Sequence, residues 1–193
     1  MSGVVVIETE RLRLCEWDAD DGAAFAEACN TPAVMRWLGG VLSPAKLAAA
    51  IERYTRWQSE RGFTFWVVRR KADAAWLGFC GLKFADTPAS PVLGELEIAW
   101  RFREDAWGQG YAREAARAAL AYAFDRLDPE RVVAVTVPGN TASRTLMERL
   151  GMRRYEELDH ADDRFGPELT DAIIHAVTRE EWSRQASPAV SQA

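Results

Sequence analysis

Apolar and polar residues alternate with a period of two in several short segments, and this period predicts β-strands. The first such segment is residues 11–17, RLRLCEW. Residues 63–70 and 75–84 are rich in β-branched and aromatic side chains. A turn that includes residues 73–74 separates them, so they predict a hairpin. Further strands are predicted at residues 131–137, 152–158 and 170–177.

The strand predicted at residues 93–102 has one apolar and one polar face, because successive side chains of a strand point to opposite sides. The apolar face carries Leu96, Ile98, Trp100 and Phe102. The polar face carries Glu95, Glu97 and Arg101. Carboxylates on the outer face of a strand are either solvated or part of a site, and both interpretations stay open.

A period of three to four residues predicts helices elsewhere in the chain. The most regular apolar stripe consists mainly of small residues, which allow close packing on a sheet: Ala112, Ala115, Ala116, Ala119, Leu120, Ala123, Phe124 and Leu127. Caps and helix-breaking residues place the other expected helices after Asp18 and Asp20, from Pro32 to Gly40, from Ser43-Pro44 to Gly62, and over residues 141–150.

This order of elements predicts a mixed α/β fold, with an antiparallel first half and a β–α–β–α–β second half. A length of 193 residues suits one domain with its own core. We expect residues 1–182 to form that domain. The small, polar segment 183–193 is expected to be a disordered tail.

Charge and cysteine content exclude several classes of function. The formal net charge of −5 gives no overall basic field for nucleic acid or an anionic membrane. Three widely spaced cysteines and two histidines predict neither a disulfide framework nor a metal site. The N-terminal three-valine run is too short for a signal peptide or a membrane span, so a cytoplasmic protein is expected.

The stretch DAWGQGYAREA, residues 105–115, places two glycines directly before the most regular helix. The first N–H groups of a helix lack partners inside the helix and attract anions. Gly108, Gly110 and the small Ala112 could therefore form a pyrophosphate cradle, with the N–H groups of residues 108–113 as donors. A tight turn that needs glycine for its backbone is the alternative. Neither a GxGxxG fingerprint nor a P-loop fits, because Arg113 occupies the third glycine position and no GK[ST] follows.

The segment from Trp100 to Ala115 resembles the acyl-CoA motif of the GNAT acetyltransferases, Q/R-x-x-G-x-G/A. Gly110 and Ala112 match its last two positions. Trp107 stands where glutamine or arginine is usual, a substitution that resembles the RimJ/RimL branch of protein N-terminal acetyltransferases. Residues 9–21, 140–152 and 171–182 are similar to other parts of that branch, so the resemblance spans about residues 9–182.

The resemblance implies a GNAT fold, a mixed and mostly antiparallel sheet with helices on both faces. It also implies acetyl-CoA as cosubstrate, no metal, and direct attack of a primary amine on the thioester. A bulge is expected to splay the strand at residues 93–102 from the next one, and the backbone exposed there would hold pantetheine and the oxyanion. The expected acetyl-CoA-binding residues are Trp100, Arg101, Phe102, Trp107, Gly108, Gln109, Gly110, Tyr111, Ala112, Arg113, Asn140 and Ser143.

Catalysis of this kind needs a base for the amine and a hydrogen-bond donor for the departing thiolate. Glu97 is the predicted base, with Glu95 as the second candidate, either acting through water. Ser143 is the predicted proton donor, because Met147 stands where the family commonly has a tyrosine. Asn140 and Ser143 could equally be a helix cap.

The acceptor stays open from the sequence alone. The branch suggests a protein N-terminal α-amine, whereas small amines and antibiotics are the alternative acceptors. A non-catalytic acyl-CoA sensor is a further alternative, and a homodimer is left open. Trp37 and Trp66 are candidates for lining the acceptor pocket or for the core, and His160 is a candidate for its entrance. His175 is expected to be packed in a strand.

Overall fold

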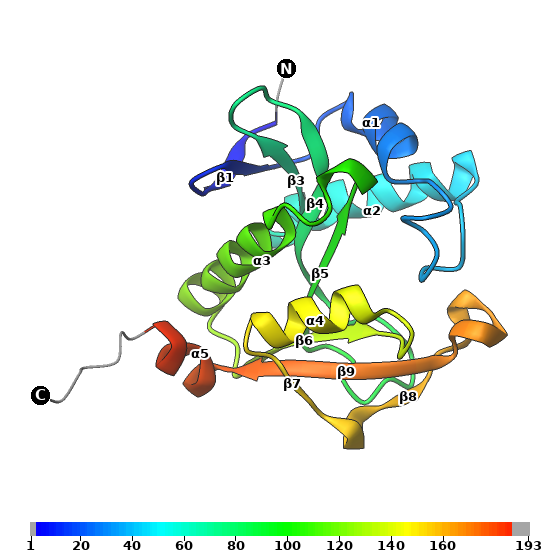
Figure 1. Cartoon of the computed structure of the whole chain (residues 1–193), viewed down its shortest axis with the longest axis vertical. Coiled ribbons are helices and arrows are strands. Elements are labelled where there is room, and N and C mark those ends of the chain that lie inside the picture. The colour runs from blue at the N-terminus through cyan, green and yellow to red at the C-terminus, as the bar shows by residue number, and fades with distance from the viewer. Residues whose placement is uncertain (1–2, 187–193) are drawn as a thin grey trace, which may run out of the picture.

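The computed structural model describes residues 3–186, and its strands form one sheet in the order β1-β2-β3-β4-β5-β6-β9-β7, with β8 paired to β9 (Figure 1). The strands are β1 (Val5–Glu8), β2 (Leu12–Cys15), β3 (Phe65–Arg70), β4 (Trp76–Phe84), β5 (Leu96–Phe102), β6 (Arg131–Thr136), β7 (Arg153–Arg154), β8 (His160–Ala161) and β9 (Asp171–Thr178). Neighbouring strands are antiparallel except β5 and β6, which are parallel.

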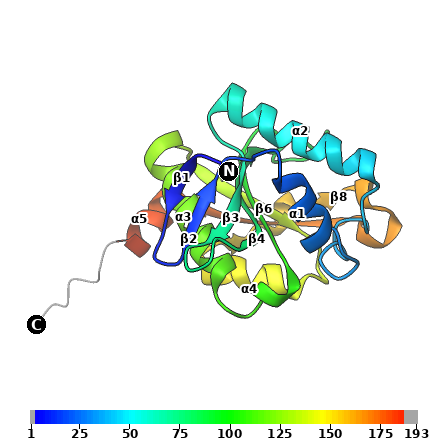
Figure 2. The same ribbon diagram turned by 90° about the horizontal axis from the view of Figure 1, so that it is seen from above.

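Helices cover both faces of the sheet, as Figure 2 shows for α2 and α4. The helices are α1 (Asp21–Ala28), α2 (Pro44–Arg61), α3 (Tyr111–Tyr122), α4 (Thr141–Arg149) and α5 (Arg179–Ala186). The apolar residues of α1 and α2 pack with one face of β3 and β4. Those of α3, α4 and α5 pack in a larger cluster on the opposite face. The predicted mixed, mostly antiparallel α/β fold is therefore confirmed.

The central feature of the sheet is the separation of β5 from β6. The two strands are paired only at Leu96↔Val132 and Glu97↔Val133. Figure 1 shows β5 meeting β6 near its start and then rising away from it. The expected bulge is not recorded between β4 and β5, whose register is unbroken from Gly78↔Phe102 to Phe84↔Leu96. The opening therefore comes from the divergence of two strands.

The prediction and the structure differ in several elements. Strand β1 was not predicted, because as an edge strand it carries mostly half-exposed valines and isoleucine that show no clear alternation. The segment from Pro32 to Gly40 consists of turns, since the Asn30 side chain bonds both the N–H and the C=O of Leu42 and closes it into a loop. Of the strand predicted at 152–158, only β7 forms, and a 3-10 turn follows at Glu156–Leu158.

The predicted boundary of the C-terminal tail is wrong for residues 183–186, which belong to α5. This helix is anchored by Trp182, whose ring stacks on Phe124 with centroids 5.6 Å apart. Residues 187–193 of the predicted tail lie outside the described part of the chain. Within residues 3–186, no helix is long and apolar enough to cross a membrane.

Candidate active site

The N-terminus of α3 has no side-chain cap. Its N-cap residue is Gly110, whereas Ser43 caps α2 and Asn140 caps α4 through their side chains. Within residues 3–186, no acceptor is recorded for the backbone N–H groups of residues 108–113. Six consecutive donors at the positive end of a helix dipole are therefore free to bind an anion.

The two glycines before α3 are required by their backbone geometry and also leave space. Gly108 has φ +72° and Gly110 has φ +81°, values that favour glycine. A methyl group built on Gly108 would meet nothing within 4 Å. The tight-turn interpretation and the cradle interpretation are thus both compatible with this loop, and the free N–H groups are what the cradle requires.

Arg11 supports the glycine loop, a role that the sequence did not reveal. Its Nε donates to Glu114 at 2.6 Å and its Nη1 donates to the Gln109 carbonyl at 3.0 Å. Its guanidinium also lies 4.6 Å from the centroid of the Tyr111 ring, and that ring is packed in the core. Glu114 is an acidic residue in the first turn of α3, where its charge would repel a bound anion. It was therefore the signal in the sequence that a cation had to lie nearby.

Trp107 and Gln109 fix the course of the loop. The Trp107 indole N–H donates to the Phe102 carbonyl at 2.8 Å, although the residue is 51% exposed. The Gln109 side chain donates to the Asp105 carbonyl. Arg113 is exposed on the first turn of α3, and Ala112 is half-buried beside the core. The loop therefore presents backbone donors next to one exposed aromatic ring and one exposed cation.

The end of β5 has an unpaired edge. The Arg103 N–H donates to the Leu77 carbonyl at 2.9 Å, and successive residues of a strand direct their N–H and C=O groups to opposite edges. The N–H and C=O groups of Trp100 and the N–H of Phe102 therefore face the edge that β6 has left, whereas the Phe102 carbonyl accepts from Trp107. Such an edge can bind an extended amide chain in the way that it would bind another strand.

The side chain of Glu97 lies on the face of β5 opposite to the one that carries Ile98 and Trp100. It is nearly buried, with 12% of the side chain exposed. Its carboxylate is 3.0 Å from Lys83 Nζ, and Lys83 also binds Asp86. Burial raises the pKa of Glu97 above its ordinary value, although Lys83 acts in the opposite direction. A carboxylate with a raised pKa is a better proton acceptor near neutral pH.

Glu95 is held in an ion pair. Its two oxygens accept from Arg131 Nε at 2.6 Å and from Arg131 Nη2 at 2.5 Å. A bidentate pair of this kind orders both side chains and occupies the lone pairs that a base would use. Its role as the second candidate base stays an untested prediction, but the geometry favours a structural role.

Asn140 and Ser143 begin α4 beside the opening. The Asn140 Oδ1 accepts the Ser143 N–H at 3.3 Å, so the capping interpretation is correct for Asn140. Met147 is 2% exposed and belongs to the core cluster. Because residues four apart share a helix face, the Ser143 side chain lies on the same face as Met147, one turn closer to the helix start. Its role as proton donor stays a prediction.

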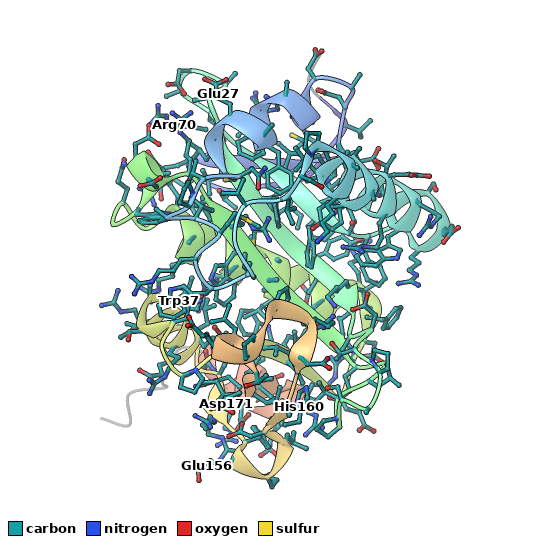
Figure 3. The ribbon with its side chains drawn as sticks, turned by 90° about the vertical axis from the view of Figure 1, so that its right-hand side faces the viewer. Glu27, Trp37, Arg70, Glu156, His160 and Asp171 are labelled. Carbon is teal, nitrogen blue, oxygen red and sulfur yellow. The ribbon has the colours of Figure 1, made fainter. Side chains whose placement is uncertain are left out.

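The loop between Asn30 and Leu42 packs against the second half of the fold. A methyl group on Gly139 would lie 2.8 Å from the Trp37 ring, so Trp37 packs directly against the turn before α4. Figure 3 shows Trp37 beside α4, with His160 toward the lower end of the molecule. Gly39 packs in a similar way against Phe165. Trp37 therefore lies against the turn that joins β6 to α4.

A cavity of about 330 Å³ lies between this loop and the segment before β9. Its lining residues are Leu38, Gly39, Gly40, Val41, Leu42, Ser43, Lys46, Arg164 and Phe165. Arg164 is 3.8 Å from Asp86 and so connects the cavity to the ion pairs around Glu97. Asp162, in the segment between β8 and β9, is bound by Arg164 and is not free to attract a cation.

The other sequence candidates lie elsewhere. Trp66 is fully buried and donates to Gln58, so it belongs to the core. His175 is buried in β9, where burial lowers its pKa, and its packed position was predicted. The His160 Nδ1 is 3.2 Å from the Leu158 carbonyl, and the residue is not among those that line the cavity. Within residues 3–186, no cluster of three metal-ligating side chains is found.

Comparison with known proteins gives a consistent match. Residues 11–153 match the family model described as "Acetyltransferase (GNAT) domain". The uncharacterized protein YkkB of Bacillus subtilis (strain 168) is 31% identical over 153 residues, which is 79% of this chain and 87% of YkkB. The FsC-acetyl coenzyme A-N(2)-transacetylase of Aspergillus fumigatus is 30% identical over 133 residues, 68% of this chain and 57% of that protein.

A solved structure has the same fold. The GNAT-family acetyltransferase of Bacillus anthracis superimposes with a TM-score of 0.72 at 24% identity. The alignment covers 90% of this chain and 98% of the other.

Proposed function

The chain belongs to the GNAT acetyltransferase family, and we propose that it transfers the acetyl group of acetyl-CoA to a primary amine by direct attack on the thioester. The observation that carries this proposal is the row of six unpartnered N–H groups at residues 108–113, next to the unpaired edge of β5. The chain is an acyltransferase, so the non-catalytic sensor considered from the sequence is set aside.

The residues present fit the binding of coenzyme A. The N–H groups of residues 108–113 would hold its diphosphate, and the open space beside Gly108 leaves room for it. The exposed guanidinium of Arg113 adds a positive charge on the first turn. The free backbone groups of Trp100 and its neighbours on β5 would pair with the pantetheine amides. When bound, acetyl-CoA supplies the activated acetyl group.

The polar face of β5 supplies the proton acceptor. An amine must lose a proton to act as a nucleophile, and a free α-amine has a pKa of about 7.7–8.0. Glu97, with its raised pKa, accepts that proton through water. The positive charge of Lys83 favours the ionised carboxylate, so Glu97 can then release the proton to solvent. The backbone N–H of Trp100 lies on the open edge and stabilises negative charge on the thioester oxygen. The Ser143 hydroxyl gives its proton to the departing thiolate and regains one from water.

The acceptor enters from the side of the Asn30–Leu42 loop. The cavity beside Phe165 is connected to the ion pairs of Glu97, which puts an entrance near the base. The family does not determine the acceptor. A protein N-terminal amine, as in the RimJ/RimL branch, and a small-molecule amine remain the two candidates.

The test is a thiol-release assay with acetyl-CoA against N-terminal peptides, polyamines, aminoglycosides and free amino acids. An acceptor-dependent release that Glu97→Gln abolishes supports the proposal. Coenzyme A binding without release from any amine would refute acetyl transfer, and absence of coenzyme A binding would refute the whole site.

A further inference from the structure

Arg101 carries a guanidinium group that the protein leaves without a partner. Its Nε and Nη1 are buried and make no hydrogen bond. Within residues 3–186, no ion pair is recorded for this side chain. The guanidinium lies beside a pair of contacting aromatic rings, 5.3 Å from the centroid of Phe25 and 5.0 Å from that of Phe79.

The neighbours of Arg101 do not compensate its charge. Burial lowers its pKa, and the titratable groups closest to it are Tyr54 and Cys29. Burial also raises the pKa of the Cys29 thiol to about 12, so that group is neutral. An ion buried without a counter-ion is unfavourable by several kcal/mol, and proteins rarely retain one without a function.

Two other shielded arginines of this chain have carboxylate partners. Arg69, with 19% of its side chain exposed, binds Asp18 and Asp21. Arg131 binds Glu95 in a bidentate pair. The missing partner is therefore peculiar to Arg101 among these three arginines.

Arg101 is among the residues expected to bind coenzyme A, but its backbone N–H and C=O groups face β4 and not the open edge, so its side chain is related here to the acceptor. Residues 97, 99 and 101 share one face of β5, because side chains two apart in a strand point the same way. Glu97 and Arg101 are thus about 13 Å apart along the strand, with only the small Ala99 between them. Cys29, which lies near Arg101, directly precedes the loop that packs Trp37 against the turn before α4.

We propose that Arg101 binds a carboxylate of the acceptor, so that the enzyme acetylates small amines whose nucleophilic nitrogen is several bonds from a carboxylate, such as the side-chain amines of amino acids. This inference rests on the proposed acetyl transfer. A carboxylate matches the planar donor edge of a guanidinium, and the pair would be shielded from water by the two rings. The charges near Glu97 support it, because Lys83 and Arg164 bind the carboxylates there and leave no free negative charge for a cationic acceptor.

The experiment compares each of several amino acids with its carboxamide and with the amine that lacks the carboxyl group. Values of kcat/KM are measured for the wild type, Arg101→Met and Arg101→Lys, with Arg117→Met as an exposed-arginine control. We expect the wild type to prefer the carboxylate form by about tenfold or more, the size expected for a charge-assisted hydrogen bond. Arg101→Met should lose this preference, keep its rate on the neutral amines and bind coenzyme A normally, and Arg101→Lys should restore part of the preference.

A second readout separates ligand binding from a structural role. Because methionine removes an uncompensated charge, Arg101→Met should raise the unfolding midpoint of the ligand-free protein, whereas a structural arginine would lower it. If Arg101→Met does not fold, inhibition of the wild type by N-acetyl amino acids but not by N-acetyl amides carries the test. Equal loss on both acceptor forms, or acetylation of neutral amines or peptides alone, overturns the inference and leaves acetyl transfer intact. Release with no amine at all would refute both.

Discussion

The indole N–H of Trp107 donates to the carbonyl of Phe102 at 2.8 Å and so ties the glycine loop to the end of β5. The two surfaces proposed to hold coenzyme A, the N–H groups of residues 108–113 and the open edge of β5, therefore keep a fixed separation. A ligand that binds both surfaces gains affinity from this preorganisation.

Replacing Trp107 with phenylalanine keeps an aromatic ring and removes the hydrogen bond. We expect KM for acetyl-CoA to rise about three- to tenfold, the effect of losing one ordinary hydrogen bond, with a smaller change in kcat. Steady-state kinetics at saturating acceptor measure both constants. Leu93→Ala, at another exposed apolar position, is the control. An unchanged KM in Trp107→Phe would show that the tie is irrelevant to binding.

Gly108→Ala tests the cradle, and Gly62→Ala is its matched control. Both glycines have left-handed φ, +72° and +77°, and a methyl group on either would meet nothing within 4 Å. Both variants should lose about 1 kcal/mol of unfolding free energy through backbone strain. Only Gly108→Ala should weaken coenzyme A, by about tenfold or more, because its methyl group occupies the space in front of the free N–H groups. Calorimetric titration with coenzyme A distinguishes them, and equal affinities would contradict the cradle.

Glu97→Gln should lower kcat/KM about 100-fold or more, the usual contribution of a general base. Because burial raises the Glu97 pKa above 4.5, the deprotonated and active form is lost as pH falls toward a value above 4.5. The wild-type pH profile should therefore have a rising limb above that value, and Glu97→Gln should lack it. Glu95→Gln should keep the limb and lose stability instead, since it breaks the pair with Arg131. If the rising limb of the pH profile disappears in Glu95→Gln, Glu95 and not Glu97 is the base.

His175 links the stability of the fold to pH. Burial lowers its pKa below 6.5, so the unfolded chain binds this proton more tightly than the folded protein does. The unfolding free energy should therefore fall as pH is lowered from 6.5 toward the folded pKa, by at most about 1.4 kcal/mol per pH unit. Urea unfolding of the wild type and His175→Gln at several pH values from 5 to 8 isolates this contribution. Identical slopes for the two proteins would contradict it.

The sequence predicted the elements whose pattern is local. The alternation at residues 93–102 assigned Glu97 and Arg101 to the correct face of β5, and the alanine stripe placed α3 on the sheet. Features set by tertiary contacts were missed. Arg11 reaches the glycine loop from a distant part of the chain, and Trp37 meets Gly139 across the opening.

The missing counter-ion of Arg101 could not be recognised from the sequence, because four acidic residues lie within ten positions of it and any of them could have paired with it. Only the fold shows that Glu97 turns to Lys83 and that Glu95 turns to Arg131. The prediction of a helix between Pro32 and Gly40 was wrong for a similar reason, because two hydrogen bonds between Asn30 and Leu42 favour a closed loop.

The central claim is that the free N–H groups of residues 108–113 hold the diphosphate of coenzyme A. A crystal structure of the complex with coenzyme A is the direct test. The account predicts that diphosphate oxygens accept hydrogen bonds from at least three of these N–H groups, within the ordinary N–H···O range of about 2.7–3.2 Å. A diphosphate bound elsewhere, with these donors covered by Arg11 or left empty, would contradict it.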